Sequence, residues 1–234
     1  MTDLEWRDDN LPVSTRFDDP YYSRHDGRAE TAHVFIDGND LPSRWKAQKT
    51  CTICELGFGT GLNFLETVRQ WQLHKPDDAS LHFISFEQFP ISVDDMERAL
   101  SNWTELEELK NRLGSIWESQ TGSIDTDFSG DIRLTVHMGD ANQLLPKSRF
   151  MADALYLDGF SPAKNPELWN ETLMREIADR TVAGGTVATY TSAGFVRRNL
   201  QDAGFRMSKI KGFGSKREML AGFKQGDIDV ADRY

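Results

Sequence analysis

The stretch Glu55-Leu-Gly-Phe-Gly-Thr-Gly61 decides the fold of this chain. It comes directly after the apolar residues 51–54 and directly before residues 62–74, where apolar side chains recur at helical spacing. Its three glycines can adopt positive φ and carry no Cβ, so a ligand can lie against bare backbone. The helix that follows directs free N–H groups and the positive end of its dipole toward that ligand. The stretch therefore predicts a strand, a glycine-rich turn and a helix that bind a nucleoside cofactor.

The spacing of the glycines distinguishes between two kinds of cofactor. A dinucleotide fingerprint requires Gly-x-Gly-x-x-Gly, whose third glycine packs the helix on the sheet. Here Leu62 occupies that third place, and Glu55 precedes the first glycine, Gly57, by two positions. This pattern resembles motif I of the class I S-adenosylmethionine-dependent methyltransferases, and the resemblance implies S-adenosylmethionine as the cofactor.

The composition indicates the class of protein. With 234 residues, 38% of them hydrophobic and 27% charged, the chain suits one large globular domain, with or without decorations. We expect a cytoplasmic protein, because no apolar run approaches the roughly 20 residues of a membrane span and no leader peptide is recognisable. Cys51 and Cys54 predict buried core thiols rather than a redox pair or half a zinc site, and no metal is expected. The net charge of −10 disfavours a general nucleic-acid coat but allows a nucleic-acid enzyme with a local basic face.

Strand and helix signals alternate from residue 51 onward, which predicts an α/β fold with a doubly wound, Rossmann-like sheet. The sheet is expected to have seven strands, mostly parallel, and to end in an antiparallel C-terminal hairpin. The expected strands are Cys51–Glu55, Leu81–Glu87, Ile132–Met138, Ala154–Leu157, Thr186–Thr191, Phe205–Lys211 and Glu218–Lys224. The expected helices are Leu62–His74, Val93–Trp103 with a continuation Glu105–Ser119, Ala141–Leu145, Leu168–Asp179 and Ala193–Asp202.

The first fifty residues differ in pattern from the rest. We expect residues 1–50 to form an N-terminal extension that packs on a core domain at 51–234. Within the extension, the residues Thr31–Ile36 predict a short strand, and Asp37-Gly38 predicts a hairpin turn after it.

Acidic residues follow three of the expected strands, at the edge where doubly wound sheets bind their ligands. Glu87 lies 30 positions after Gly57 and can accept the hydroxyl protons of a ribose. Asp140 can accept the exocyclic amine of adenine, cap the helix that follows it, or do both. Asp158 opens the stretch Asp-Gly-Phe-Ser-Pro, which places a carboxylate and the ring of Phe160 beside a methyl sulfonium.

Three separated motifs together resemble one narrow family. They are Glu55–Leu65, Leu157–Trp169 and Gly212–Leu220, and the stretch Phe17–Ser23 is similar as well. The chain is identified on these motifs, over essentially its whole length, with the methyltransferase domain of the MnmC family. The resemblance implies transfer of a methyl group from S-adenosylmethionine to 5-aminomethyl-2-thiouridine at the wobble position of tRNA, giving 5-methylaminomethyl-2-thiouridine. Bifunctional members continue into an FAD-dependent oxidase domain, so this chain, which stops at Tyr234, is expected to be a stand-alone member or an excised domain.

The resemblance also implies roles for individual residues. Asp158 and Phe160 are implied at the transferred methyl group, where Asp158 orients the amine and accepts its proton. The residues implied at the cofactor are Tyr22, Ser23, Glu55, Gly57, Phe58, Gly59, Gly61, Asn63, Glu87, Gln88, Asp140, Ala141 and Asp158. Those implied at the tRNA substrate are Lys164, Trp169, Phe213, Lys216 and Arg217, of which the aromatic ones could stack on an extruded base.

Three rival functions remain open from the sequence. The first is an NAD-linked oxidoreductase, which the missing third glycine and the terminal hairpin disfavour. The second is a methyltransferase whose acceptor is a small molecule, a protein amine or another RNA. The third is a non-catalytic module that keeps a nucleoside pocket, which the intact Asp158 loop disfavours.

Overall fold

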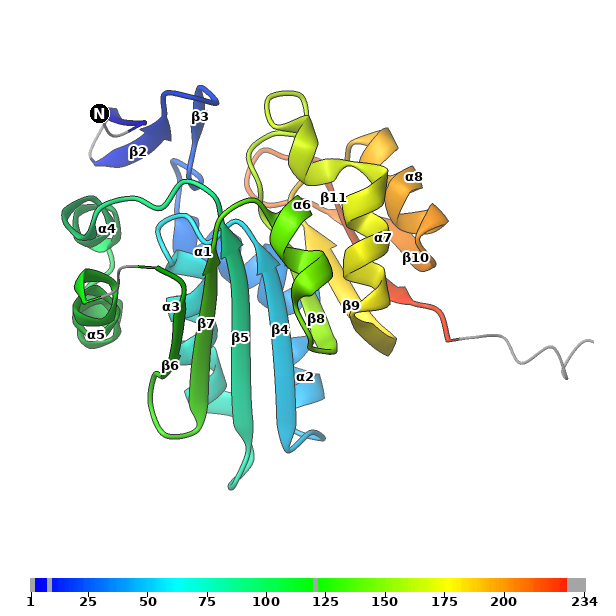
Figure 1. Cartoon of the computed structure of the whole chain (residues 1–234), viewed down its shortest axis with the longest axis horizontal. Coiled ribbons are helices and arrows are strands. Elements are labelled where there is room, and N and C mark those ends of the chain that lie inside the picture. The colour runs from blue at the N-terminus through cyan, green and yellow to red at the C-terminus, as the bar shows by residue number, and fades with distance from the viewer. Residues whose placement is uncertain (1–2, 8–9, 120–121, 227–234) are drawn as a thin grey trace, which may run out of the picture.

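The computed structural model describes residues 3–7, 10–119 and 122–226 (Figure 1). Its centre is an eight-stranded sheet in the order β10-β11-β9-β8-β4-β5-β7-β6. The strands are β4 (Thr50–Leu56), β5 (Ser80–Glu87), β6 (Ile124–Asp127), β7 (Ile132–Met138), β8 (Ala152–Leu157), β9 (Thr181–Thr189), β10 (Phe205–Lys211) and β11 (Glu218–Lys224). Strands β7, β5, β4, β8 and β9 run parallel, whereas β6, β11 and β10 pair antiparallel with their neighbours.

Helices cover both faces of this sheet. In Figure 1, α1 (Gly27–Thr31), α2 (Leu41–Trp45) and α3 (Leu62–His74) lie behind the sheet, and α6 (Ala141–Leu144) and α7 (Glu171–Asp179) lie in front. The remaining helices are α4 (Val93–Leu100), α5 (Glu107–Glu118), α8 (Gly194–Asp202) and the short η1 (Ala32–Asp37), η2 (Thr104–Leu106), η3 (Leu145–Lys147) and η4 (Pro166–Trp169). Each face of the sheet has its own buried cluster, so the doubly wound fold predicted from the sequence is confirmed.

The two cysteines illustrate the two clusters. Cys51 is buried in the cluster behind the sheet and Cys54 in the cluster in front, because side chains three positions apart on a strand point to opposite faces. Both are free thiols, and burial raises the pKa of each, so the prediction of buried core thiols is confirmed.

The N-terminal residues form a second, small sheet above the carboxyl ends of the central strands (Figure 1). Its strands are β1 (Leu4–Arg7), β2 (Leu11–Ser14) and β3 (Asp19–Pro20). The backbone N–H of Ser161, in the loop after β8, donates to the Asp19 carboxylate at 2.8 Å, so the small sheet is tied to the main one. The division of the chain at residue 50 stays a prediction. Within the first fifty residues, η1 packs on α3 in the same buried cluster as the core.

The predicted strand at Thr31–Ile36 is wrong. These residues lie at the end of α1 and in η1, and Gly38 continues the right-handed helical backbone with φ −59°, so Asp37-Gly38 makes no hairpin. The signal for the helix stands upstream, where the Asp26 carboxylate caps α1 by accepting from the Ala29 N–H at 3.1 Å. The β-branched and aromatic residues that suggested a strand instead pack in the core.

The sheet also has one strand more than the seven predicted. All seven expected strands are present, and β6 adds an eighth at the edge, antiparallel to β7. Its two aspartates are poor strand formers, but the Asp125 carboxylate accepts two hydrogen bonds from the Arg133 guanidinium on β7, at 2.6 and 2.8 Å. A cross-strand ion pair of this kind cannot be predicted from the residue pattern of one segment, because its partner lies on another strand.

Candidate active site

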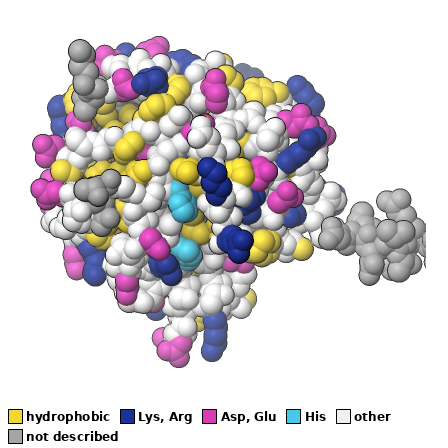
Figure 2. All heavy atoms as spheres, viewed as in Figure 1, with side chains coloured by type: hydrophobic (Ala, Val, Ile, Leu, Met, Phe, Trp, Pro, Cys, Tyr) yellow, Lys and Arg dark blue, Asp and Glu magenta, His cyan; other side chains and the backbone are white. Residues whose placement is uncertain are grey.

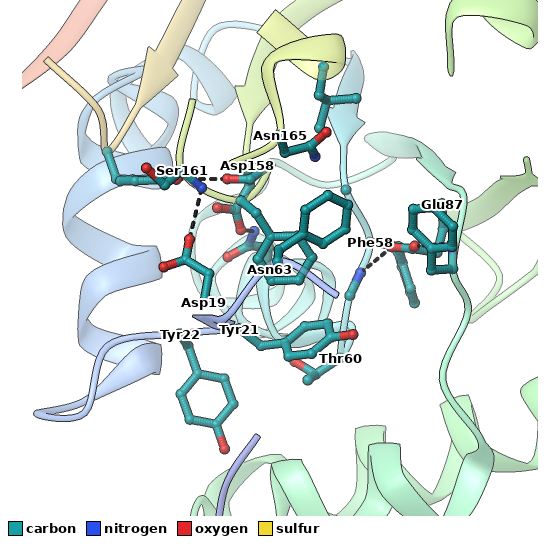
Figure 3. Close-up of a pocket in the computed structure, with 18 of the residues that line it drawn as sticks. Asp19, Tyr21, Tyr22, Phe58, Thr60, Asn63, Glu87, Asp158, Ser161 and Asn165 are labelled. Atoms are coloured by element: carbon teal, nitrogen blue, oxygen red, sulfur yellow. Dashed lines mark hydrogen bonds between the residues drawn. The ribbon is translucent and has the colours of Figure 1, made fainter. Parts of the chain in front are cut away.

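A cavity of ≈ 340 Å³ lies at the carboxyl ends of β4, β5, β7 and β8, beneath the small N-terminal sheet (Figure 3). Its volume is within the range of pockets that hold nucleoside-sized ligands. The predicted residues that line it are Tyr22, Ser23, Gly57, Phe58, Gly59, Asn63, Glu87, Gln88, Asp140, Ala141, Asp158, Phe160 and Lys216. The structure thus brings most of the predicted cofactor residues together.

The glycine-rich turn forms the floor of this cavity. Gly57 and Gly59 have φ of +95° and +53°, which other residues rarely adopt. A Cβ on Gly57 would stand 2.2 Å from the Asp158 carbonyl oxygen, so this position requires glycine for the close approach as well as for its φ. The backbone of the turn is therefore bare toward the cavity. Gly61 lies further along, where it begins α3 with φ +78°, and does not itself line the cavity.

Glu87 ends β5 beside the turn, where its side chain is only 8% exposed. Its carboxylate accepts hydrogen bonds from the backbone N–H groups of Gly59, at 2.8 Å, and Phe89, at 2.7 Å (Figure 3). Burial raises the pKa of Glu87, and hydrogen bonds from the backbone, that of Gly59 first, oppose the rise. A buried acceptor is thus fixed against the turn that would carry the ligand.

Asn63 joins the buried carboxylate of Glu55 to the partly buried carboxylate of Asp158. Its side-chain amide donates to Glu55 at 2.9 Å and to Asp158 at 2.6 Å, as Figure 3 shows for Asp158. The Thr31 hydroxyl donates to the Asn63 amide oxygen at 2.6 Å, which fixes the amide orientation. The Ser85 hydroxyl donates to the other oxygen of Glu55 at 2.7 Å. Glu55 thus supports Asn63 from behind and does not line the cavity.

Burial changes the acidity of both carboxyl groups. It raises the pKa of Asp158 to about 7, with the hydrogen bond from Asn63 opposing the rise. It raises the pKa of Glu55 to about 8, against the hydrogen bonds from Ser85 and Asn63. Strongly shifted acids gathered at a cavity are typical of sites that exchange protons with a ligand. Asp158 lines the cavity and can therefore exchange a proton near neutral pH.

The loop after β8 carries the aromatic wall of the cavity. The Phe160 ring stacks on Phe17 with centroids 4.7 Å apart and meets the edge of Tyr21 at 5.1 Å. Trp169, predicted to stack on a base, is only 1% exposed, and its indole N–H donates to the Phe160 carbonyl at 2.9 Å. That prediction is corrected: no ring face of Trp169 is open to a base, and the residue instead supports the Phe160 loop.

Asp140 ends β7 and caps the next helix. Its carboxylate accepts from the Asn142 N–H at 2.9 Å, which confirms the prediction that Asp140 caps the helix. Asp140 also lines the cavity. Phe58 lines the cavity while its ring stacks on Trp117, 5.2 Å away.

The other predicted substrate residues surround the rim. Lys164 reaches back to the small sheet, where its ammonium donates to the Asp18 carbonyl and lies 3.8 Å from the Asp19 carboxylate. Phe213 is partly buried with its ring 6.0 Å from that of His33, and Arg217 is exposed in the β10–β11 connection. Among the five, the cavity lining includes Lys216 alone.

The lining residues that were missed from the sequence include Glu30, Thr31 and Tyr190. Thr31 was hidden by the incorrect strand assignment of Thr31–Ile36, and Glu30 directly precedes that segment. The capping residue Asp26 could have indicated the helix that contains both. Tyr190 directly follows β9, another parallel strand of the same sheet, so its place at the carboxyl edge was open to prediction.

Over the described ranges, no cluster of three or more His, Cys, Asp or Glu side chains is arranged to hold a metal ion. In the same part of the chain, no helix has the length and apolar character that crossing a membrane requires.

Residues 104–225 match a family described as S-adenosyl-L-methionine-dependent methyltransferase. The chain belongs to this family. It is an enzyme family, and its cofactor is S-adenosylmethionine, so the NAD-linked and non-catalytic rivals lose their support. The cavity fits that cofactor, because bare glycine backbone, a buried carboxylate and an aromatic wall meet in it.

Relatives of this methyltransferase carry a more specific name. A protein of Chromohalobacter salexigens is 43% identical over 94% of this chain and 32% of its own length. A protein of Vibrio cholerae is 46% identical over 94% of this chain and 34% of its own length. Both are named "tRNA 5-methylaminomethyl-2-thiouridine biosynthesis bifunctional protein MnmC", which agrees with the family resemblance seen in the motifs. The chain spans about a third of the length of these curated relatives.

Solved structures confirm the methyltransferase fold. MNMC2 from Aquifex aeolicus has a TM-score of 0.74 at 24% identity, over 95% of this chain and 70% of its own. Spermidine synthase from Thermotoga maritima has a TM-score of 0.51 at 10% identity, over 98% and 74%. At these identities the likeness concerns the fold alone.

Proposed function

We propose that this chain transfers a methyl group from S-adenosylmethionine to the primary amine of 5-aminomethyl-2-thiouridine at the tRNA wobble position. The observation that carries the proposal is the 43–46% identity, over 94% of the chain, to proteins named for this tRNA modification. The cavity supports it, because the partly buried carboxylate of Asp158 and the ring of Phe160 both line it, directly after β8.

In this proposal the glycine turn and the strand ends hold the cofactor. The bare backbone of Gly57 and Gly59 lies along its methionine part, and the Glu87 carboxylate accepts the hydroxyl protons of its ribose. Asp140 accepts from its adenine with the carboxylate oxygens that capping leaves free. Tyr22 is fixed by a hydrogen bond from its hydroxyl to the Ala99 carbonyl at 2.8 Å, which lets the N-terminal segment cover the ligand.

When bound, S-adenosylmethionine supplies an electrophilic methyl group on a positively charged sulfur. The acceptor amine must be uncharged to attack, so its ammonium form must first lose a proton. Asp158 is placed to take that proton, since it lines the cavity and burial raises its pKa to about 7. Asn63 orients the carboxylate, and much of the rate would come from positioning.

The tRNA would be bound by a local basic surface. Acidic and basic side chains are interspersed on the face shown in Figure 2, in keeping with the net charge of −10. We place the contact at the β10–β11 connection, where the exposed Lys216 and Arg217 lie beside the cavity rim. Phosphate contacts there would make tRNA binding sensitive to salt.

The aminomethyl group must be supplied by another enzyme activity. The relatives are named bifunctional, and this chain spans 32–34% of their length. We propose that an FAD-dependent oxidase domain, fused or separate, prepares the amine that this chain methylates. A cytoplasmic location, where tRNA is modified, is part of the same proposal.

Transfer of a labelled methyl group tests the proposed function. The wild-type chain is incubated with labelled S-adenosylmethionine and tRNA that carries 5-aminomethyluridine, with and without the 2-thio group. We expect label in the wobble nucleoside and none in tRNA with unmodified uridine. Label in small or protein amines, with none in either tRNA, would show that the acceptor is different and would reject the proposal.

A further inference from the structure

An ion pair of one carboxylate and one ammonium stands at the rim of the cavity. Glu30, on α1, accepts from the Ser23 backbone N–H at 3.0 Å and from the Lys216 ammonium at 3.0 Å, one on each oxygen. The Glu30 side chain is 13% exposed and that of Lys216 is 45% exposed. The carboxylate is therefore a fixed part of the wall, whereas the ammonium sits on a long side chain that can swing away.

The same ammonium lies over an aromatic face. The Lys216 nitrogen is 4.3 Å from the centroid of the Tyr190 ring, which is a cation–π contact. The Tyr190 hydroxyl donates to the Gly159 carbonyl at 2.8 Å, so the ring is held by the residue that follows Asp158. A carboxylate and a ring face thus surround one primary ammonium, next to the proposed proton acceptor.

The charges of this group act on Asp158. Apart from burial and its bond to Asn63, the pKa of Asp158 is raised by Glu30 and lowered by Lys216. All three side chains line the same cavity. If Lys216 leaves, the Ser23 backbone N–H is the one hydrogen-bond donor that the described part of the chain still offers to Glu30, so a partly buried carboxylate is left that favours another cation.

We propose that Glu30 and Tyr190 form a subsite for a primary ammonium, which the substrate's protonated aminomethyl group enters by displacing Lys216. This inference rests on the proposed function. Once there, the ammonium gives one proton to the ionised Asp158 carboxylate, leaving a neutral amine and a protonated Asp158.

The test measures how much the aminomethyl group adds to tRNA binding. Two tRNAs, one with 5-aminomethyluridine and one with unmodified uridine at the wobble position, are titrated in the presence of S-adenosylhomocysteine, so that no methyl transfer occurs. The ratio of the two dissociation constants cancels the phosphate contacts that both tRNAs make. We expect a wild-type preference for the aminomethyl tRNA of about 10-fold or more, as hydrogen bonds to a charged group provide.

Four variants decide whether the subsite receives the substrate. Glu30→Gln should bring the ratio close to one, whereas Lys216→Met should increase it, because the competing ammonium is gone. Tyr190→Leu should lower the ratio a few-fold, and Tyr190→Phe should keep it, since the ring remains. Binding of S-adenosylhomocysteine, measured for each variant, verifies that the fold is intact.

The matched control is the ion pair of Lys209 and Glu218, 2.5 Å apart on β10 and β11 and outside the cavity lining. Lys209→Met and Glu218→Gln should leave the ratio unchanged. A wild-type ratio of one overturns the subsite. The subsite is also overturned if Glu30→Gln and Lys216→Met change the ratio of dissociation constants in the same direction and by the same factor. That result would mean that the ion pair only positions the β10–β11 connection. Methyl transfer by the wild-type chain is measured separately, so a failure of the proposed function is distinguished from a failure of the subsite.

Discussion

Acidic side chains differ in burial, in hydrogen-bond partners and in pKa between the two ends of the central strands. At the carboxyl ends, Glu55 and Glu87 are buried and Asp158 is partly buried. All three are bonded mainly to neutral donors, and burial raises the pKa of each. At the other end of β7, Asp125 pairs with Arg133 in the open, and that hydrogen-bonded guanidinium lowers the pKa of the carboxyl group. Acids with a raised pKa thus gather around the cavity, where Asp158 and Glu87 face the ligand and Glu55 supports them from behind, whereas the acid away from the cavity is paired with a guanidinium.

The glycines differ between the two ends as well. Gly57 at the carboxyl end and Gly130 in the β6–β7 turn both have positive φ, +95° and +63°. A Cβ on Gly57 would collide with the Asp158 carbonyl, whereas a Cβ on Gly130 would meet nothing within 4 Å. Backbone conformation alone explains Gly130, but Gly57 also serves the close packing of two loops at the site.

The largest expected effect is on catalysis. Asp158→Asn should lower kcat for methyl transfer by about 10²–10⁴-fold, the usual contribution of a general base, with little change in cofactor affinity. Asp125→Asn, at the opposite end of the sheet, should leave kcat unchanged. Single-turnover methyl transfer measures both, and equal rates for wild type and Asp158→Asn would remove Asp158 from the chemistry.

Gly57→Ala should come next. The added methyl group cannot fit against the Asp158 carbonyl, so we expect a stability loss about 2 kcal/mol larger than for Gly130→Ala, together with loss of cofactor binding. Gly130→Ala should lower the free energy of unfolding by about 1–2 kcal/mol, the cost of a positive φ for alanine, and should keep cofactor binding. Urea unfolding and calorimetric titration give the two quantities, and equal losses for the pair would contradict the close approach.

The pH dependence of the rate should follow Asp158. Its pKa of about 7 predicts that kcat/KM rises about tenfold per pH unit below pH 7 and levels off above it, as the carboxylate ionises. The rising limb should vanish in Asp158→Asn and persist in Asp125→Asn. A wild-type profile that is flat between pH 5.5 and 8 would show that this proton is not transferred.

The smallest effect concerns stability. Because the folded state raises the pKa of Glu55 from 4.5 to about 8, it holds a proton that the unfolded chain has lost. The stability of the wild type should therefore fall as pH rises through this window. Glu55→Gln should lose less stability as the pH rises, so its Tm should decrease less between pH 6 and 8.5 than the Tm of the wild type. An unchanged slope would mean that Glu55 is ionised in the folded protein.

Much of the site was predictable because it follows local rules. The glycine turn, the helix after it and the acids at three strand ends are set by positions close in sequence, and β7, β10 and β11 begin and end where predicted. The parts that failed depend on contacts with a neighbouring strand or loop, eight and nine residues away along the chain. Strand β6 depends on Arg133 of the neighbouring strand, and the burial of Trp169 depends on the loop of Phe160.

The error at Thr31–Ile36 had the largest consequence for the site. Its residues have strand propensity, but the core packs them as α1 and η1, and Asp26 fixes where the helix begins. Helix α1 places Glu30 beside Lys216 and Thr31 beside Asn63. Without this helix in the prediction, neither residue was assigned to the cavity.

Calorimetric titration with S-adenosylmethionine measures whether the carboxyl ends of the strands, through Glu87 and the glycine turn, hold the cofactor. The variants are Glu87→Ala and Asp125→Ala, one acid from each end of the sheet. We predict micromolar binding by the wild type and Asp125→Ala, and binding about 10–100-fold weaker by Glu87→Ala. Equal affinity for all three proteins would contradict this assignment of the cofactor site.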